Sequence, residues 1–376
     1  MMDKSQFSAQ KLTYARIARG MTMKKLSELA NISRQMISNY EAGKTTPKGS
    51  NLLKLADVLN FPPSFFGNYT QPLNPGAEFF RNQSATSKRL RDMQKVRLLF
   101  ARNIFDTLSV YVKFPKINLP ASLDIDFDQI SNSTIASKAK ELRTLWGFDN
   151  VIPIPNLVKV AEANGIIIAK ANMKDSKLDA VSKWIVDRPF ILLTDNGESS
   201  VRRRFNVAHE IGHLLLHSSV ESIYDLTSKE MKLLEKQANM FASYFLLPNK
   251  AFMDTLMTTS IEGYVDLKRY WKVSIQAMIY KTRFLELITD DQYLYLSKKI
   301  AWNKWKKSEP LDNTIPMEEP ALFSTVYKMI TDHGLMTNQG LKATLSLPDD
   351  ELSKMVGKIV LKHSSIGMNQ PKLKLL

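Results

Sequence analysis

Two histidines and a glutamate in the stretch from Arg204 to His217 have the spacing that a metal-dependent hydrolase needs. The stretch is predicted to be helical, and residues four apart on a helix lie nearly above one another, so His209 and His213 can bind one metal ion. Glu210 points off that face, where its carboxylate can act as a general base toward water. A zinc ion with few protein ligands keeps a position for that water and lowers its pKa to about 7. The pattern therefore predicts a zinc peptidase site.

A third ligand is needed, because two imidazoles hold zinc poorly. A second helix is predicted from Leu234 to Pro248, with Glu235 on its inner side and a loop long enough to bring the two helices together. Two histidines and a glutamate are the ligand set of gluzincin-like peptidases, so we predict His209, His213 and Glu235 as zinc ligands. Asn239 lies one turn after Glu235 and is expected to orient an imidazole N–H from outside the ligand set.

Other residues near this motif keep two interpretations each. His217 shares a face with His213, but about 12 Å of helix separates it from His209, which favours packing or imidazole orientation over ligation. Tyr244 would either stabilise an oxyanion or, as we favour, pack at the rim. The basic run 202–204 is expected to be a solvated helix start, with substrate contact as the alternative.

A DNA-reading module is indicated by the pattern of residues 9–60. A helix from Arg34 to Glu41, capped by Ser33, would bury Met36, Ile37 and Tyr40, and the preceding helix would bury a stripe that includes Leu29. The polar side chains left outside are types that bind base edges and phosphates. We predict DNA contacts from Ser33, Arg34, Gln35, Ser38, Asn39 and Lys44. Such an arrangement is a helix-turn-helix, and Lys and Arg outnumber Asp and Glu by ten to four over residues 1–69.

The composition narrows the choice of partners. The chain has 376 residues, a formal net charge of +15 and a pI of about 9.6, which favours nucleic acid as partner over an anionic membrane surface. It has no cysteine, so any metal must be held by His, Asp or Glu. No apolar run approaches the ~20 residues that cross a bilayer, and the N-terminus carries no signal region. We expect a soluble, cytoplasmic protein without a membrane partner.

Pro- and Asn-rich breaks divide the chain. We predict a helix-turn-helix domain over residues 1–70, a basic helical connector over 71–120 with its boundary at 71–76, a zinc metallopeptidase domain over 121–290, and a helical C-terminal region of unassigned role over 291–376. The connector's basic residues, Arg81 and Lys88 among them, would form a solvated face or extend phosphate contact beside the first domain.

The expected fold class is α+β, mainly helical with a small sheet. Strands are predicted at 165–169, 181–186 and 189–194, the last two as a hairpin. An edge strand of this sheet would align an extended substrate. The pattern of residues 264–288 is similar to a second helix-turn-helix, but we favour a pair of helices that pack into the domain. The basic aromatic stretch 302–307 is a weaker indication of nucleic-acid contact. Further helices are expected near 322–330 and 352–361.

Two segments resemble known families. Residues 32–47 are similar to the XRE/Cro family of phage-repressor-like DNA-binding domains. The sequence from His209 to His217, followed by Glu235, Ala238-Asn239 and Leu246-Leu247-Pro248, resembles the ImmA/IrrE metallopeptidases, and similarity to their longer, fused subgroup runs from Phe79 to about Pro310. The resemblance implies that His209, His213 and Glu235 are zinc ligands and Glu210 is the general base. Members often carry an XRE-type module and cleave repressors of mobile elements or stress regulons.

Two functions follow as expectations. The first is a homodimeric, operator-binding transcription regulator whose zinc endopeptidase domain cleaves a repressor or toxin encoded nearby, or another copy of itself. The alternative is a non-catalytic XRE-family transcription factor or antitoxin whose metallopeptidase-like domain senses a ligand or binds a partner. Glu210 favours the enzyme, because a purely structural zinc site needs no base.

Overall fold

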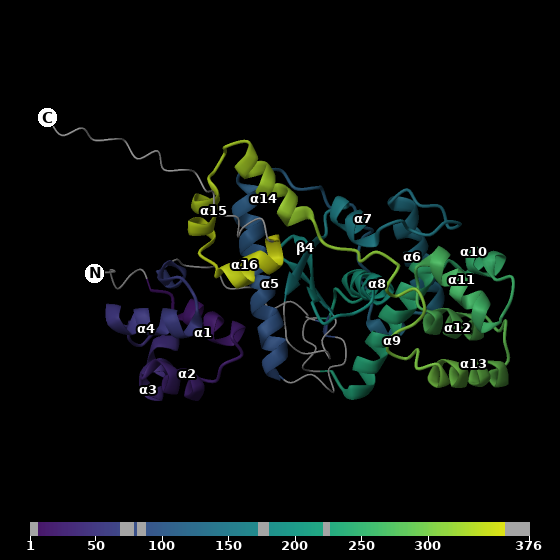
Figure 1. Ribbon diagram of the computed structural model, residues 1–376, viewed down its shortest axis with the longest axis horizontal. Helices are drawn as coiled ribbons and strands as arrows, with labels where there is room; N and C mark the ends of the chain where they lie inside the picture. Colours follow the sequence, from purple (N-terminus) through teal and green to yellow (C-terminus); the bar gives the residue numbers. More distant parts are fainter. Residues whose placement is uncertain (1–6, 68–78, 81–87, 172–179, 221–225, 358–376) are drawn as a thin grey trace.

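The computed structural model describes residues 7–67, 79–80, 88–171, 180–220 and 226–357, and the side chains of 79, 80 and 88 are outside the description. Helices surround one small sheet (Figure 1), so the predicted α+β class is confirmed. The boundary expected at 71–76, the basic Arg81, the side chain of Lys88 and the end of the helix expected at 352–361 lie outside the described residues. Within the described part, no helix is both long and apolar enough to cross a membrane.

The N-terminal bundle forms one end of the molecule in Figure 1. Its helices are α1 (Ala9–Ala18), α2 (Met23–Ala30), α3 (Arg34–Glu41) and α4 (Gly49–Leu59), followed by a 3-10 turn at Pro63–Gly67. Thr22 and Ser33 cap α2 and α3, each by accepting a hydrogen bond from the backbone N–H three residues later. Gly43, just after α3, has a φ of +69°, which a residue with a side chain rarely adopts.

Fewer apolar side chains are buried in the bundle's core than the sequence pattern predicted. Ile37 and Tyr40 are buried as predicted, but the prediction for Met36 and Leu29 was wrong: they are 41% and 49% exposed. Leu53 of α4, another apolar residue, is 60% exposed. Since α2 and α3 have only eight residues each, each buries a single stripe, and the neighbouring position along the helix is turned away by about 100°.

Helix α5 (Lys88–Ser109) is a core helix rather than a solvated connector. It lies between the bundle and the sheet (Figure 1) and packs against α1, β4, α14 and α15. Its buried apolar side chains are Leu90, Val96, Leu98, Phe100, Ala101, Ile104, Phe105 and Leu108. The solvated-face interpretation fails at Arg97, which is buried, because Arg97 faces an acidic partner from far along the chain.

That partner is Glu351 on α16 (Asp349–Val356). The Arg97 guanidinium donates to both carboxylate oxygens, at 2.8 and 3.0 Å, and to the carbonyl oxygen of Ala18 at the end of α1, at 3.1 Å. On the surface beside it, Arg19, the residue directly after α1, forms an ion pair with Asp350 at 2.6 Å. These charges join α1, α5 and α16 and so fix the N-terminal bundle to the rest of the chain.

The sheet has four strands in the order β1-β3-β4-β2, with bounds β1 (Phe79–Phe80), β2 (Ile167–Ala171), β3 (Ala180–Ile185) and β4 (Arg188–Thr194). The predicted hairpin is present as antiparallel β3 and β4, and β2 pairs in parallel with β4. Strand β2 begins two residues later than expected. An open edge for substrate is not found at residues 181 and 182 of β3, because β1 pairs with them.

The helices beyond the sheet form the other end of the molecule (Figure 1). They are α6 (Asn132–Leu145), α7 (Leu157–Ala163), α8 (Ser200–Leu216), α9 (Ser228–Leu246), α10 (Asn249–Thr255), α11 (Ile261–Trp271), α12 (Ile275–Phe284) and α13 (Asp290–Trp302). The pair α11 and α12 packs into the core through buried Trp271 and Met278, as the packing interpretation expected. The carboxylate of Glu309 accepts from the backbone N–H groups of Ile275 and Gln276 and so holds the start of α12.

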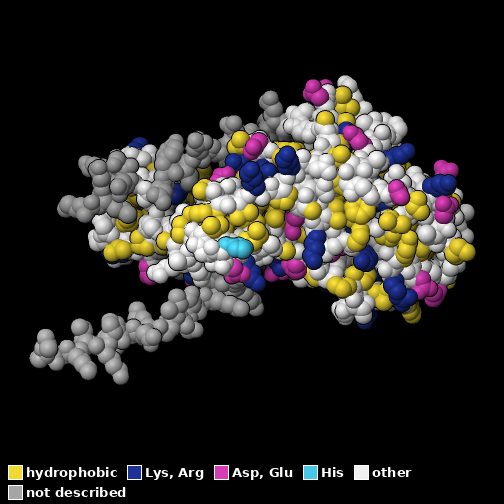
Figure 2. Space-filling view, turned by 90° about the horizontal axis from the view of Figure 1, so that it is seen from above, with side chains coloured by type: hydrophobic (Ala, Val, Ile, Leu, Met, Phe, Trp, Pro, Cys, Tyr) yellow, Lys and Arg dark blue, Asp and Glu magenta, His cyan; other side chains and the backbone are white. Residues whose placement is uncertain are grey.

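The C-terminal helices α14 (Leu322–Asp332), α15 (Asn338–Leu345) and α16 pack over α5, and α14 and α16 also cover β2. The helix expected at 322–330 is therefore present, and the one expected at 352–361 begins earlier. Figure 2 shows one face of the described residues, on which basic side chains are dispersed among acidic and apolar ones. On that face the net charge of +15 does not gather into one stripe.

Replacing the buried acid should loosen the bundle's attachment. Glu351→Gln leaves the Arg97 guanidinium buried without its counter-charge, so we expect the free energy of unfolding to fall by about 3 kcal/mol. Asp350→Asn, at the neighbouring exposed pair, should change it by less than about 1 kcal/mol. Chemical denaturation of the full chain measures both. Equal, small losses in the two variants would contradict a structural role for the buried pair.

Candidate metal centre and cavity

Helices α8 and α9 bring the predicted site residues together, and Gly212 permits their close approach. A Cβ added at Gly212 would lie 3.1 Å from the Cβ of Phe241 on α9. That distance is tighter than ordinary side-chain contact, so a larger residue would push α9 and its Glu235 away from α8. The glycine in the middle of the motif therefore serves packing.

The side chains of His209, His213 and Glu235 converge on one point. The two Nε2 atoms are 2.9 Å apart, and the Glu235 carboxylate oxygens lie 3.5 Å from Nε2 of His209 and 3.7 Å from Nε2 of His213. One potential ligand atom from each residue lies within 4.8 Å of the other two. Both imidazoles are buried, whereas the Glu235 side chain is 22% exposed, so the group opens on the carboxylate side.

Asn239 fixes the orientation of the first imidazole. Its side-chain oxygen lies 3.0 Å from Nδ1 of His209. An amide oxygen only accepts hydrogen bonds, so Nδ1 carries the proton and Nε2 keeps a lone pair directed at the common point. This is the contact expected of Asn239.

A longer chain of hydrogen bonds fixes the second imidazole. The Gln237 amide nitrogen donates to the carbonyl oxygen of Phe127 at 2.6 Å, which directs the Gln237 oxygen to Nε2 of His217 at 2.9 Å. His217 must therefore donate from Nε2 and accept at Nδ1. The Nδ1 of His213, 2.9 Å away, supplies that proton and leaves its own Nε2 lone pair facing Glu235.

His217 is thus uncharged and lies behind the site rather than in it. Burial lowers the pKa of His217 to about 3, against a raising effect of the hydrogen bond to Gln237. A neutral ring is what the relay needs, since a protonated His217 could not accept from His213. Gln237 was not singled out from the sequence, because its partner, the carbonyl of Phe127, belongs to a residue 110 positions earlier.

This donor set fits a divalent cation. Two lone pairs from neutral imidazoles and one carboxylate face a common point, and they would repel one another without a positive charge between them. In a tetrahedral zinc site two ligand nitrogens are about 3.3 Å apart, close to the separation found here. Three protein ligands leave a fourth position open, as in catalytic rather than structural zinc sites.

Glu210, the expected general base, follows His209 on α8 and is fully buried. Its backbone carbonyl accepts a hydrogen bond from the Ser182 hydroxyl at 3.2 Å, and Trp184 donates to the carbonyl of Leu214 at 3.1 Å. The motif is therefore fixed against β3 on one side and α9 on the other.

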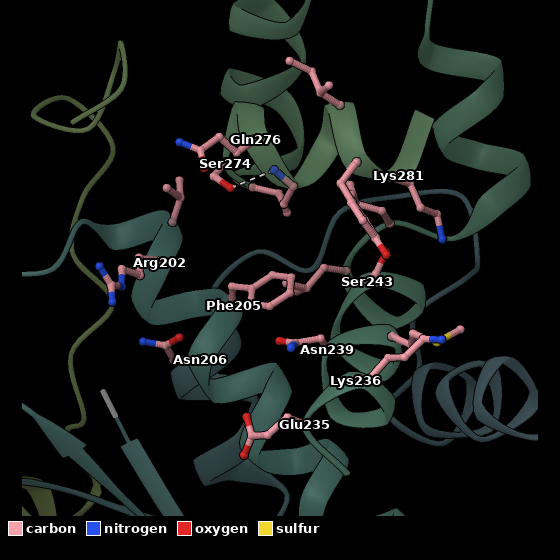
Figure 3. Close-up of a pocket in the computed structure, with 18 of the residues that line it drawn as sticks. Arg202, Phe205, Asn206, Glu235, Lys236, Asn239, Ser243, Ser274, Gln276 and Lys281 are labelled. Atoms are coloured by element: carbon pink, nitrogen blue, oxygen red, sulfur yellow. Dashed lines mark hydrogen bonds between the residues drawn. The ribbon is translucent and has the colours of Figure 1, made fainter. Parts of the chain in front are cut away.

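A cavity of about 1270 Å³ opens beside this group. Figure 3 shows Glu235 and Asn239 of α9 in the lower part of the view, Phe205 of α8 near the centre and Lys281 of α12 at the upper right. Tyr244 also lines it, and the Lys281 ammonium lies 4.2 Å from the centre of the Tyr244 ring. These ring contacts match the packing interpretation of Tyr244 more closely than an oxyanion contact.

Only part of the basic run on α8 is solvated. Arg202 lines the cavity, as the substrate-contact alternative requires. The expectation of a solvated helix start was wrong for Arg203 and Arg204, which are buried in ion pairs. Arg203 pairs with Glu198 at 3.0 Å and Glu319 at 2.8 Å, and Arg204 with Glu318 at 2.8 Å. The acids at 318 and 319 lie more than 100 positions after this helix, and no local pattern indicates that their segment packs against it.

The predicted DNA contacts lie together on and just after α3. Ser33, Arg34, Gln35 and Lys44 are exposed, and Ser38 and Asn39 are half-buried. The Gln35 amide donates to the Asn39 side-chain oxygen at 3.3 Å. Helix α3 is at the end of the molecule opposite to α10–α13 (Figure 1), so this face is separate from the cavity.

Comparison with known families matches both regions. Residues 12–66 match the helix-turn-helix family model, and residues 161–283 match the model described as the IrrE N-terminal-like domain, of peptidase family M78. The chain joins an XRE-type helix-turn-helix domain to an IrrE/ImmA-like domain. None of the curated proteins matches the chain. The M78 match contains His209, Glu210, His213, Glu235, Asn239 and Lys281 within its bounds.

The relay predicts defined tautomers. In the full chain with zinc added, the ¹⁵N imidazole spectrum should show His213 protonated at Nδ1 and His217 at Nε2, and with five histidines in the chain assignment by single replacement is practical. In the metal-free chain, Gln237→Leu removes the acceptor, so His217 should lose its single tautomer while His209, held by Asn239, keeps its own. Protonation of His217 at Nδ1 in the unmodified chain would contradict the relay.

Proposed function

We propose that this fusion is a DNA-binding transcription regulator whose second domain is a zinc-dependent endopeptidase acting on a partner regulatory protein. The observation that carries the proposal is the meeting of His209, His213 and Glu235 beside a cavity, next to buried Glu210. The domain division at 1–70, 71–120, 121–290 and 291–376 is part of the proposal. Within it, α5 of the connector and α14–α16 of the last region act as the packing that joins the two functional domains.

The chemistry follows from what each residue holds in place. His209 and His213 present Nε2 lone pairs, Glu235 adds a negative charge, and Asn239 and His217 keep the two rings oriented. A divalent cation held by these three ligands would supply a Lewis acid that polarises a peptide carbonyl and acidifies water. Glu210 would take the proton of the attacking water and return it to the leaving amine. Burial of Glu210 keeps this proton exchange away from bulk solvent.

Two glutamate variants separate metal binding from proton transfer. Glu210→Gln should keep zinc and lose about 10³-fold in cleavage rate, because only the base is removed. Glu235→Gln should lose both zinc and cleavage, because a ligand charge is removed. Zinc content after dialysis and cleavage of proteins encoded beside this gene measure the two effects.

Glu262→Gln, at an exposed position of α11, is the matched control and should change neither zinc content nor rate. Full cleavage by the Glu210→Gln chain would refute the proposed role of that carboxylate, and full zinc retention by the Glu235→Gln chain would refute the ligand set.

The first domain is proposed to read an operator with α3. Arg34, Gln35 and Asn39 carry the donors and acceptors that distinguish bases in the major groove, and Ser33 and Lys44 at its ends suit phosphates. Ser38 lies on the same helix and completes the reading face. A homodimer on two half-sites is the arrangement usual for this motif.

Replacing the base-reading residues should relax sequence preference. Arg34→Ala and Asn39→Ala should each lower discrimination at their base pair by about 1–3 kcal/mol, as measured by selection from random DNA and binding titration. Lys44→Ala should weaken binding to all sequences and reduce the salt dependence, whereas Lys140→Ala, on α6, should do neither. Unchanged operator selectivity in both Arg34 and Asn39 variants would argue against α3 as the reading helix.

A non-catalytic regulator or antitoxin is the second candidate, and one observation favours it. Strand β1 pairs with Val181 and Ser182 of β3, and the Ser182 hydroxyl donates to the carbonyl of Glu210. A segment of the same chain thereby occupies a position that an extended substrate would use. If this candidate is correct, Glu210→Gln leaves repression in cells unchanged; if the peptidase is correct, the same variant abolishes relief of repression.

A further inference from the structure

Lys281 is a buried cation with an unusual environment. Its side chain is 2% exposed, and its ammonium nitrogen makes no hydrogen bond to any residue in the described part of the chain. It lies over two rings instead, 4.2 Å from the centre of Tyr244 and 5.8 Å from that of Phe284. Ring faces attract a cation but do not replace an anion, and burial lowers the pKa of Lys281 to about 7, so the ammonium form is left without a counter-charge in the described part of the chain.

A second buried lysine in the same domain has acidic partners that balance its charge. Lys268 on α11 is fully buried, and its ammonium lies 2.8 Å from Glu309 and 2.6 Å from Asp312. Within the described residues, the fold supplies two carboxylates to Lys268 and none to Lys281. The difference is that Lys281 lines the cavity and Lys268 does not.

The cavity wall around Lys281 favours negative charge. Its other lining cations are Arg91, Arg202, Lys232, Lys236, Lys306 and Lys307. The acids that line it are Glu235, Glu309 and Asp312, of which the last two already face Lys268 and the first belongs to the metal group. The wall as described therefore has an excess of positive charge, and an acidic ligand would meet attraction along its length.

The position of Lys281 relative to the metal group places it away from the reacting bond. Tyr244, under the ammonium, is nine residues after Glu235 on the same helix, or roughly 14 Å along its axis at 1.5 Å per residue and about two and a half turns around it. Lys281 would therefore contact a bound polypeptide at a residue other than those at the cleaved bond.

We propose that Lys281 forms an acidic-side-chain subsite, in which its ammonium binds an Asp or Glu carboxylate of a polypeptide held in the cavity beside the metal group. This assignment deepens the proposed peptidase function and rests on it. The ligand class itself, an acidic peptide segment, follows from the unpaired ammonium and the basic wall. Lys281 is then a specificity residue. It selects which polypeptides bind in the cavity and does not contact the reacting atoms.

Binding tests the subsite without any need for cleavage. The zinc-loaded full chain carrying Glu210→Gln is titrated with labelled, capped hexaglutamate and hexaglutamine peptides. Hexaglutamate should bind more tightly than hexaglutamine, and Lys281→Met should weaken it about tenfold, the effect of losing one charge-assisted hydrogen bond. Lys281→Arg should retain most of the affinity, because the charge remains.

Lys298→Met, at an exposed position of α13 outside the cavity, removes the same charge and should leave hexaglutamate affinity within about twofold. Met fills nearly the volume of Lys without a buried charge, so the melting temperature of Lys281→Met should be at or above that of the parent. Equal hexaglutamate affinities for the Lys281→Met and Lys298→Met chains would overturn the subsite.

Cleavage tests whether the subsite acts on substrates. The unmodified zinc-loaded chain should cleave a peptide library with Asp or Glu enriched at one fixed position away from the cut. Lys281→Met should abolish that enrichment while cuts at neutral sequences persist, and unchanged enrichment would overturn the assignment. A chain that cleaves nothing, yet loses hexaglutamate binding in Lys281→Met, keeps the acidic subsite and refutes the peptidase.

Discussion

The hydrogen-bonded chain from the Phe127 carbonyl through Gln237 and His217 to His213 is the constraint on which the site depends. A backbone carbonyl has no proton to give, so each member of the chain has only one way to bond, and the lone pair on Nε2 of His213 is the result. Asn239 does the same for the other imidazole. The metal group is therefore set up by residues outside it, at distances that leave room for one cation.

Helical periodicity could predict which residues meet at the site. Two imidazoles four residues apart share a face, and Glu235 lies on the inner side of the next amphipathic helix. Both placements could therefore be predicted from the local sequence pattern. The same reasoning identified α3 and its cap at Ser33. It failed for Met36 and Leu29, which were predicted to be buried because they are apolar. A short helix buries only one stripe of side chains, so an apolar residue beside that stripe remains exposed.

Charged residues buried by distant partners could not be predicted in this way. Arg97 is polar by sequence and buried by Glu351, 254 positions later, and Arg204 is buried by Glu318. Lys281 is buried next to a ring on α9, without an acidic partner among the residues that the structure describes. Such positions depend on which helices become neighbours, and α14–α16 and the segment at 309–319 return to pack on elements far earlier in the chain. Local periodicity does not indicate which distant segments will pack against each other.

The central claim is that His209, His213 and Glu235 bind one zinc ion with a position left open. X-ray absorption at the zinc edge of the full chain measures this directly. The account predicts four light ligands near 2.0–2.1 Å, with multiple scattering from two imidazoles in the unmodified chain and from one in His209→Ala. A spectrum without imidazole scattering, or one unchanged by His209→Ala, would contradict it.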